Sequence, residues 1–206
     1  MNHVQAMMSV TDKKAIVVTV DNVFARDYEL VPEIGVSRDE KSAGELQYDS
    51  MNGSEFAVFM AETLVPYIQQ HYNVYTDALH TAITGASLGG LETFYITMEY
   101  PDVFGTLGAF SPSFWEYDEA TWKKYLSDKK FNADSPLLYF YTGPVKLDTD
   151  PDVTNMRNRL KDMGYPQDKL ILHLNEKGVH KADCWSNMFP EFLTAMCLQR
   201  VELLQK

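Results

Sequence analysis

Short apolar runs alternate along this chain with longer segments whose apolar residues recur at helical spacing. The continuous runs, rich in β-branched and aromatic residues, predict strands at residues 15–20, 81–84, 104–110, 136–141 and 170–174. The helical spacing predicts helices at residues 54–68, 91–100, 121–126, 151–163 and 188–204, with the end of another at residues 1–8. This alternation predicts a single α/β domain over residues 1–206, with a mostly parallel sheet.

Three residues are predicted to mark helix ends. Ser54 is expected to cap the helix that follows it, and Asp150 to cap the next long one with Pro151 at the first helical position. Gly164 is expected to end that second helix.

A long polar segment, residues 23–53, has no clear period. Loops of this length are uncommon unless they shape a site or are mobile. Arg26, Tyr28 and Glu29 would leave the carboxyl end of the strand at residues 15–20. A role in a site and a solvated loop are both open for these three residues.

The run at residues 81–84 leads into Gly85-Ala86-Ser87-Leu88-Gly89, and a helical segment follows at once. A strand that turns sharply into a helix with serine at the apex is the nucleophile elbow of serine hydrolases. Gly85 and Gly89 lack Cβ atoms that would clash in so tight a turn. A glycine-rich turn without chemistry is the alternative, but the flanking strand and helix favour the elbow.

The composition limits partners and compartment. Lys and Arg number 18 against 29 Asp and Glu, a net charge of −11, which argues against a nucleic-acid partner. Cys184 and Cys197 form neither a CxxC pair nor a Cys/His cluster, and no glycine-rich phosphate loop occurs. We therefore expect free buried thiols, no metal and no nucleotide cofactor. The absence of a signal peptide and of an apolar run of membrane-spanning length favours a cytoplasmic protein without a membrane partner.

A serine nucleophile needs a base, and His180 is the strongest of the five histidines. His3 lies near the terminus, His71 and His80 precede the elbow strand, and His173 lies inside a strand pattern. His180 alone follows the last strand in a loop. Its position also agrees with the chain order serine, acid, histidine of this type of hydrolase.

The acid that orients the base is expected in the loop after residues 136–141. Asp150 is explained by a structural role as a helix cap, and Asp152 by a place in the first helical turn. Asp148 has no such structural role and is therefore the first choice. Glu176, in the same loop as His180, is the fallback. The backbone N–H of Leu88 is expected to donate to the oxyanion, and no second donor can be named.

Several segments together resemble the putative esterase family of α/β-hydrolases, which includes enterochelin esterase-like proteins and the feruloyl and acetyl-xylan esterases of carbohydrate esterase family 1. The segments that carry the resemblance are residues 20–32 (VDNVFARDYELVP), 85–90 (GASLGG), 100–104 (YPDVF), 111–115 (SPSFW) and 180–193. The resemblance implies a three-layer α/β-hydrolase fold, with Ser87 as nucleophile and His180 as base. It also implies that residues 111–115, including Trp115, and Trp185 help to wall the pocket.

Two features depart from that family. The family acid usually stands three residues after the glycine matching Gly143, and here that position is Lys146; Asp148 can substitute if the loop is slightly longer. Family members also begin with further strands, one of which supplies an oxyanion donor, so the resemblance implies an N-terminally shortened form. In the family order the missing strand lies between residues 15–20 and the elbow strand. The two strands then pair directly, another chain fills the gap and makes a homodimer, or the sequence is a shortened form of a longer protein.

Two functions follow from these residues. The first is a serine esterase that forms an acyl-enzyme on Ser87 and cleaves small-molecule esters such as acylated sugars. The second is a catalytically impaired relative that acts as a binding or scaffold protein, which Lys146 and the shortened N-terminus would suit.

Overall fold

A computed structural model describes residues 14–21, 26–36, 51–144 and 146–204 of the 206-residue chain. Four parallel strands form one sheet in the order β1-β2-β3-β4. They are β1 (Ala82–Ala86), β2 (Thr106–Phe110), β3 (Leu137–Thr142) and β4 (Leu170–Leu174). The predicted alternation of strands and helices in a parallel α/β fold is confirmed.

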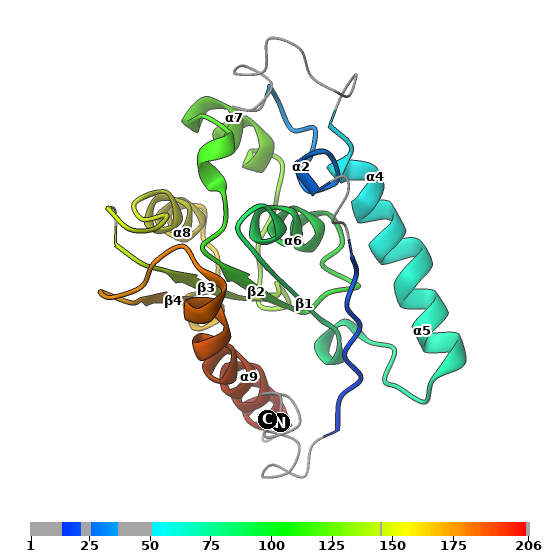
Figure 1. Ribbon diagram of the computed structural model, residues 1–206. Coiled ribbons are helices and arrows are strands. Elements are labelled where there is room, and N and C mark those ends of the chain that lie inside the picture. The colour runs from blue at the N-terminus through cyan, green and yellow to red at the C-terminus, as the bar shows by residue number, and fades with distance from the viewer. Residues whose placement is uncertain (1–13, 22–25, 37–50, 145, 205–206) are drawn as a thin grey trace.

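Helices cover both faces of the sheet (Figure 1). One face carries α6 (Leu88–Glu99), α7 (Glu119–Leu126) and α8 (Asp152–Asp162), and α9 (Ala182–Leu204) lies on the other. All residues of β3 are buried, and they alternate between the two cores. Leu138 and Phe140 face the larger one, and Tyr139 and Tyr141 pack with Phe192 of α9. This two-sided burial explains why β3 reads as a continuous apolar run.

The prediction of a buried strand at residues 15–20 is wrong. Residues 14–21 form no strand, and the side chains of Ile16, Val17 and Val18 are 48, 58 and 44 % exposed. Among the described residues β1 pairs only with β2, so residues 14–21 have no strand partner there. β-branched residues favour extended backbone, but a strand also needs a partner for its hydrogen bonds.

The described residues of the segment after the first apolar run contribute to the core. They include the short helix α2 (Arg26–Glu29), and Leu30, Val31 and Met51 enter the core. Backbone N–H groups of Asn52 and Gly53 donate to the carbonyls of Tyr28 and Val31, which joins the two ends of the segment. Residues 22–25 and 37–50, and the predicted helix end at residues 1–8, lie outside the described residues.

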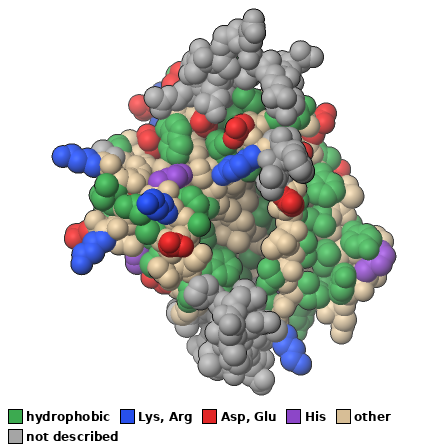
Figure 2. All heavy atoms as spheres, viewed as in Figure 1, with side chains coloured by type: hydrophobic (Ala, Val, Ile, Leu, Met, Phe, Trp, Pro, Cys, Tyr) green, Lys and Arg blue, Asp and Glu red, His purple; other side chains and the backbone are tan. Residues whose placement is uncertain are grey.

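The helix predicted at residues 54–68 is longer and is not regular. It runs through α4 (Gly53–Val58), a π-helical part η1 (Phe59–Leu64) and α5 (Val65–His71), and Asn52 rather than Ser54 is its N-cap residue. Pro66 lies in the first turn of α5. Because proline has no N–H and its ring crowds the preceding turn, the wider π-helical turns before it accommodate its ring. Apolar side chains gather on the surface of this helix in Figure 2, among them Val58, Phe59 and Tyr67.

The starts of two other helices differ from the prediction. α8 begins at Asp152 with Pro151 as its N-cap residue, and Asp150 accepts a hydrogen bond from the Thr154 hydroxyl instead of from a backbone N–H. α9 begins at Ala182, six residues before the predicted start, and runs through Pro190. Gly164 ends α8 as predicted, at a φ of +86°.

Candidate active site

Ser87 stands between β1 and α6 in a strained backbone conformation. Its φ of 59° is in the left-handed region, which non-glycine residues rarely adopt. Its carbonyl oxygen accepts hydrogen bonds from the N–H groups of Gly90, Leu91 and Ser113, and its own N–H donates to Phe110. The turn is therefore fixed on both sides, as expected for an elbow.

Only one of the two glycines of the motif is required by close packing. A Cβ atom on Gly85 would lie 2.2 Å from the Gly89 carbonyl oxygen, whereas a Cβ on Gly89 would meet nothing within 4 Å. The expectation that both glycines avoid a clash is thus right for Gly85 and wrong for Gly89. The helix climbs past Gly85, and Gly89 faces open space.

His180 and Ser87 come together although their strands are the two outer strands of the sheet. His180 Nε2 lies 2.9 Å from Ser87 Oγ. Three strand spacings, about 14 Å, separate β1 from β4, so the loop after β4 has to pass back over the end of β3. A Cβ on Gly143 would lie 2.5 Å from the Gly178 carbonyl oxygen, which shows how closely the loops after β3 and β4 pack.

Asp148 accepts a hydrogen bond from the other ring nitrogen of His180. The Nδ1–Oδ1 distance is 2.8 Å, and the Asp148 side chain is 0 % exposed while that of His180 is 33 % exposed. The His180 N–H also donates to the Leu147 carbonyl, so the two loops are joined through their backbones. Since a carboxylate only accepts, Nδ1 carries the proton and Nε2 is free to accept the serine proton.

The pKa of Asp148 is lowered from its ordinary value. Burial acts to raise this pKa, but hydrogen bonds from His180, Ser111 and the Gly143 N–H, together with the charge of His180, outweigh it. The carboxyl therefore stays ionised at neutral pH, as an orienting group must.

The other candidates lie elsewhere. Asp150 is bound to Thr154, Asp152 lies in the first turn of α8, Glu176 is exposed, and so is Lys146. Of the other histidines, His71 binds the Tyr67 carbonyl, His80 binds Asp77, and His173 binds Glu191; His3 lies outside the described residues. The structure thus brings Asp148, rather than the alternatives, to His180.

Two tryptophans contact the His180 ring. The ring of Trp185 meets it edge-on, with centroids 5.0 Å apart at 89°, and that of Trp115 lies 5.8 Å away at 65°. Both residues were predicted from the resemblance to wall the pocket. The structure shows them packed against the His180 ring.

Leu88 is the first residue of α6. The first backbone N–H groups of a helix have no partner within the helix. Arg26 lies near the same point. Its Nη2 donates to the Ala86 carbonyl at 3.5 Å, and its buried Nη1 has no hydrogen-bond partner among the described residues. Sequence reasoning left Arg26 open between site and loop. Its place shortly after the apolar run at residues 15–20 was the available signal.

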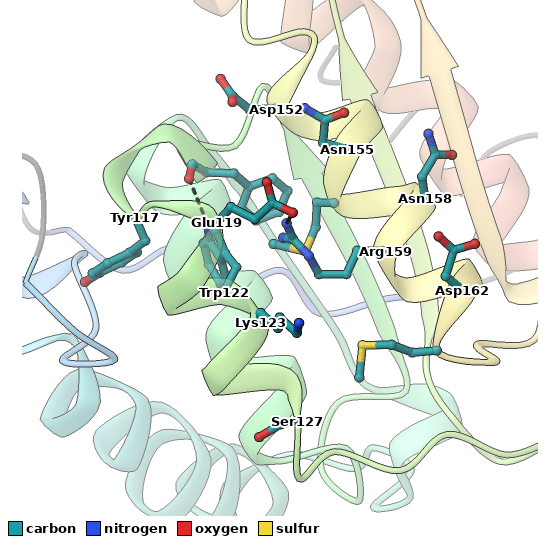
Figure 3. A pocket seen from close by; sticks show the side chains of 13 residues that line it. Tyr117, Glu119, Trp122, Lys123, Ser127, Asp152, Asn155, Asn158, Arg159 and Asp162 are labelled. Carbon is teal, nitrogen blue, oxygen red and sulfur yellow. Dashed lines mark hydrogen bonds and ion pairs between the residues drawn. The ribbon is translucent and has the colours of Figure 1, made fainter.

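A separate hollow of about 780 Å³ lies between α7 and α8 (Figure 3). Lys123 and Asn155 are among its lining residues, and the Arg159–Glu119 ion pair, 3.7 Å long, also lies there. None of Ser87, Asp148 and His180 lines it. Phe114, which directly precedes Trp115 in the sequence, is one of its lining residues, and its carbonyl accepts a hydrogen bond from the Trp122 indole.

Neither a metal site nor a membrane span is found in the described part of the chain. No group of three or more His, Cys, Asp and Glu side chains there could hold a metal ion. No described helix is both long and apolar enough to cross a membrane. Cys184 is a free, half-buried thiol.

Known proteins share both the sequence pattern and the fold. Residues 4–139 match the model of the family described as putative esterase. The chain is 24 % identical over 136 residues to the uncharacterized protein YbbA of Bacillus subtilis (strain 168), covering 62 % of this chain and 53 % of YbbA. It is 23 % identical over 170 residues to an endo-1,4-beta-xylanase/feruloyl esterase of Xylanibacter ruminicola, covering 81 % of this chain and 21 % of that protein.

Among solved structures, the ferric enterobactin esterase of Salmonella typhimurium superimposes with a TM-score of 0.58 at 20 % identity, covering 72 % of this chain and 38 % of that one. The chain therefore spans about half the length of YbbA and a smaller part of the other two proteins. The match to the family model covers most of the chain, and the structural likeness shows the same fold. This chain belongs to the putative esterase family, and its fold is that of the α/β-hydrolases.

Proposed function

We propose that this chain is a serine esterase that cleaves carboxylic esters through an acyl-enzyme on Ser87. The observation that carries the proposal is the continuous hydrogen-bonded row Ser87–His180–Asp148, with distances of 2.9 and 2.8 Å. Nucleophile, base and orienting acid within hydrogen-bond reach form the general arrangement for acyl transfer.

In the proposed first step, His180 Nε2 takes the Ser87 proton while Oγ attacks the ester carbonyl. The tetrahedral intermediate collapses, the ester C–O bond breaks, and the alcohol leaves with the proton that His180 held. Water, deprotonated by His180, then attacks the acyl-enzyme and releases the acid. Asp148 stabilises the imidazolium in both steps.

The oxyanion is proposed to bind the Leu88 N–H and the Arg26 guanidinium. Arg26 reaches the carbonyl of Ala86, the residue before the nucleophile, from the side of β1 that has no strand neighbour among the described residues. The sequence resemblance implied that a missing strand would supply the second donor at this place. A guanidinium is well suited to replace it, because it is always charged and donates several hydrogen bonds.

The proposed substrates are small esters, including acylated sugars. The feruloyl esterase and enterobactin esterase named above act on esters according to their names, which supports ester chemistry but not one substrate. A comparison of short p-nitrophenyl esters with feruloyl and acetylated sugars would rank the candidates.

A fluorophosphonate probe tests the proposal directly, because it reacts with an activated serine. The wild-type chain should be labelled, and Ser87→Ala should not. Ser113→Ala is the matched control, since its Oγ lies 3.5 Å from Ser87 Oγ and its loss should leave a label on Ser87. A folded wild-type chain that stays unlabelled would favour the alternative, a binding or scaffold protein.

A further inference from the structure

Ser111 lies outside the proposed row of catalytic groups but is bonded to it. Its hydroxyl donates to Asp148 Oδ2 at 2.7 Å, and its oxygen accepts the Trp185 indole N–H at 2.9 Å. The row therefore extends from Trp185 through Ser111 and Asp148 to His180 and Ser87. Three separate segments contribute, because Ser111 follows β2, Asp148 follows β3, and Trp185 lies in the first turn of α9.

The hydrogen bonds on both sides of Ser111 can point in only one direction. An indole N–H donates and cannot accept, and a carboxylate accepts and cannot donate. The single proton of the Ser111 hydroxyl therefore has to point at Asp148. Ser111 is 0 % exposed, so water does not compete for this proton.

The backbone of Ser111 is held in a conformation that costs free energy. Its φ is +46°, in the left-handed region, directly after β2 ends at Phe110. Its N–H donates to the Tyr141 carbonyl at 2.7 Å, which extends the pairing of β2 with β3 by one residue. A serine in this conformation is explained by the position that its hydroxyl reaches, because glycine would fit the backbone with less strain.

Ser111 also determines which oxygen of Asp148 is left for the base. Oδ2 accepts from the Ser111 hydroxyl and from the Gly143 N–H, both at 2.7 Å, and Oδ1 accepts from His180 Nδ1. Two donors on one oxygen fix the plane of the carboxylate. Oδ1 is thereby directed at the Nδ1–H of His180.

We infer that Ser111 is a positioning residue for the acid Asp148, and that Trp185 sets the direction of the Ser111 hydroxyl. This inference rests on the proposed function for its effect on turnover. Trp185 acts twice, because its ring also packs edge-on against His180.

Kinetics of variants at Ser111 and Trp185 test the inference. Ser111→Ala and Ser111→Gly remove the hydroxyl, and the glycine variant relieves the positive φ, so a loss shared by both is due to the hydroxyl and not to the backbone. A lost hydrogen bond to a charged group predicts a fall in kcat of about ten- to a hundredfold. Trp185→Phe keeps a ring but removes the N–H, and predicts a fall of roughly two- to tenfold.

The double variant Ser111→Gly/Trp185→Phe separates the two roles of Trp185. If the indole N–H acts through Ser111, the double variant should be as active as Ser111→Gly. Trp115→Phe is the control, since Trp115 touches the same imidazole but makes no described hydrogen bond to Ser111. Its effect should add to that of Ser111→Gly. Additive effects for Trp185→Phe would overturn its assigned role.

The pH profile gives a readout that a merely structural role would not change. Without the Ser111 donor, Asp148 becomes a stronger acceptor for the His180 Nδ1 proton and stabilises the imidazolium. The acid limb of kcat/KM should then move to higher pH in both Ser111 variants. An unmoved limb in folded variants would contradict the inference.

Proton NMR makes the test independent of ester hydrolysis. The His180 Nδ1 proton, bonded to a carboxylate, should resonate far downfield at low pH and should shift in Ser111→Gly and in Trp185→Phe. If the wild-type chain is inactive but this proton responds, the esterase proposal fails and the positioning role stands. If the proton is unchanged in Ser111→Gly, the positioning role fails whatever the activity.

Discussion

His180 Nε2 lies 2.9 Å from Ser87 Oγ although 93 positions separate the two residues. They follow β4 and β1, the two outer strands of the sheet. The contact depends on the close packing of the loops after β3 and β4, and the bond from the His180 N–H to the Leu147 carbonyl holds those loops together. The hydrogen bond between His180 and Ser87 therefore depends on two loops that are themselves bonded to each other.

Asp148→Asn tests the orienting acid. An amide in this place can donate to Nδ1 and stabilise the wrong tautomer of His180, so kcat should fall by about 10⁴-fold with little change in fold. Steady-state kinetics with a p-nitrophenyl ester measure it. Asp150→Asn and Glu176→Gln are the matched controls, because neither residue is bonded to His180, and both should retain activity within a few fold. A large loss in Glu176→Gln instead would transfer the role to that residue.

Arg26→Ala tests the proposed second oxyanion donor. Loss of one donor to the transition-state charge should lower kcat by about 10²–10³-fold and change KM much less. Arg159→Ala is the control for loss of a positive charge, because Arg159 of α8 pairs with the exposed Glu119 of α7. This variant should keep its activity. A rise in KM with no change in kcat would show that Arg26 binds the substrate and the transition state equally and is not a specific oxyanion donor.

The two glycines of the elbow should respond differently to alanine. Gly85→Ala places a Cβ 2.2 Å from the Gly89 carbonyl, so the turn has to open and fluorophosphonate labelling of Ser87 should be lost, along with several kcal/mol of stability. Gly89→Ala meets nothing within 4 Å and lies in the first turn of α6, so it should be tolerated or slightly stabilising. Thermal unfolding and labelling of both variants provide the comparison, and the opposite order would refute the observed packing.

Glu92, on α6, is 0 % exposed, and neither carboxyl oxygen has a hydrogen-bond partner among the described residues. Burial, with a smaller contribution from the charge of Glu33, raises the pKa of Glu92 well above its ordinary value of 4.5. Between the two pKa values the folded chain binds more protons than the unfolded chain, so stability is lost as pH rises above about 4.5.

Glu92→Met should therefore be more stable than the wild type at pH 8, by about 1–3 kcal/mol, and this advantage should shrink toward pH 5. Urea unfolding at the two pH values measures it. Glu55→Met, at an exposed position of α4, is the control and should show no such trend. A Glu92→Met chain that is less stable at high pH would mean that the carboxylate has a partner.

The elements that pattern predicted well are those whose neighbours are close in sequence or buried on both sides. β1 and β3 follow from the apolar runs at residues 81–84 and 136–141. His180 was selected because it alone follows the last strand in a loop, and its role as base stays a prediction. Asp148 was chosen over Asp150 and Asp152 because the latter two had local roles at the helix start. In the structure, the path of the loop after β3 carries Asp148 to His180, and the local roles of Asp150 and Asp152 do not reveal that path.

What could not be predicted depends on tertiary contacts. Residues 15–20 have the composition of a strand but no pairing partner among the described residues. Composition alone does not say which strands pair. The link from Trp185 through Ser111 to Asp148 joins residues up to 74 positions apart and requires a left-handed serine that no periodicity reveals. Arg26 reaches Ala86 across 60 positions in the same way.

The outer edge of β1 has a consequence for handling the protein. The Thr81 carbonyl accepts from the Gly105 N–H just before β2, and the Ser87 N–H donates to the Phe110 carbonyl in β2. The backbone groups of Ala82 and Thr84 therefore point the other way, where no strand of the described chain pairs with them. An unpaired strand edge favours pairing with the strands of other chains, and the exposed side chains of Ile16, Val17 and Val18 add apolar surface. We therefore expect concentrated solutions to form β-rich aggregates at temperatures below that at which the fold unfolds. A charged residue in place of Thr84 should delay this aggregation.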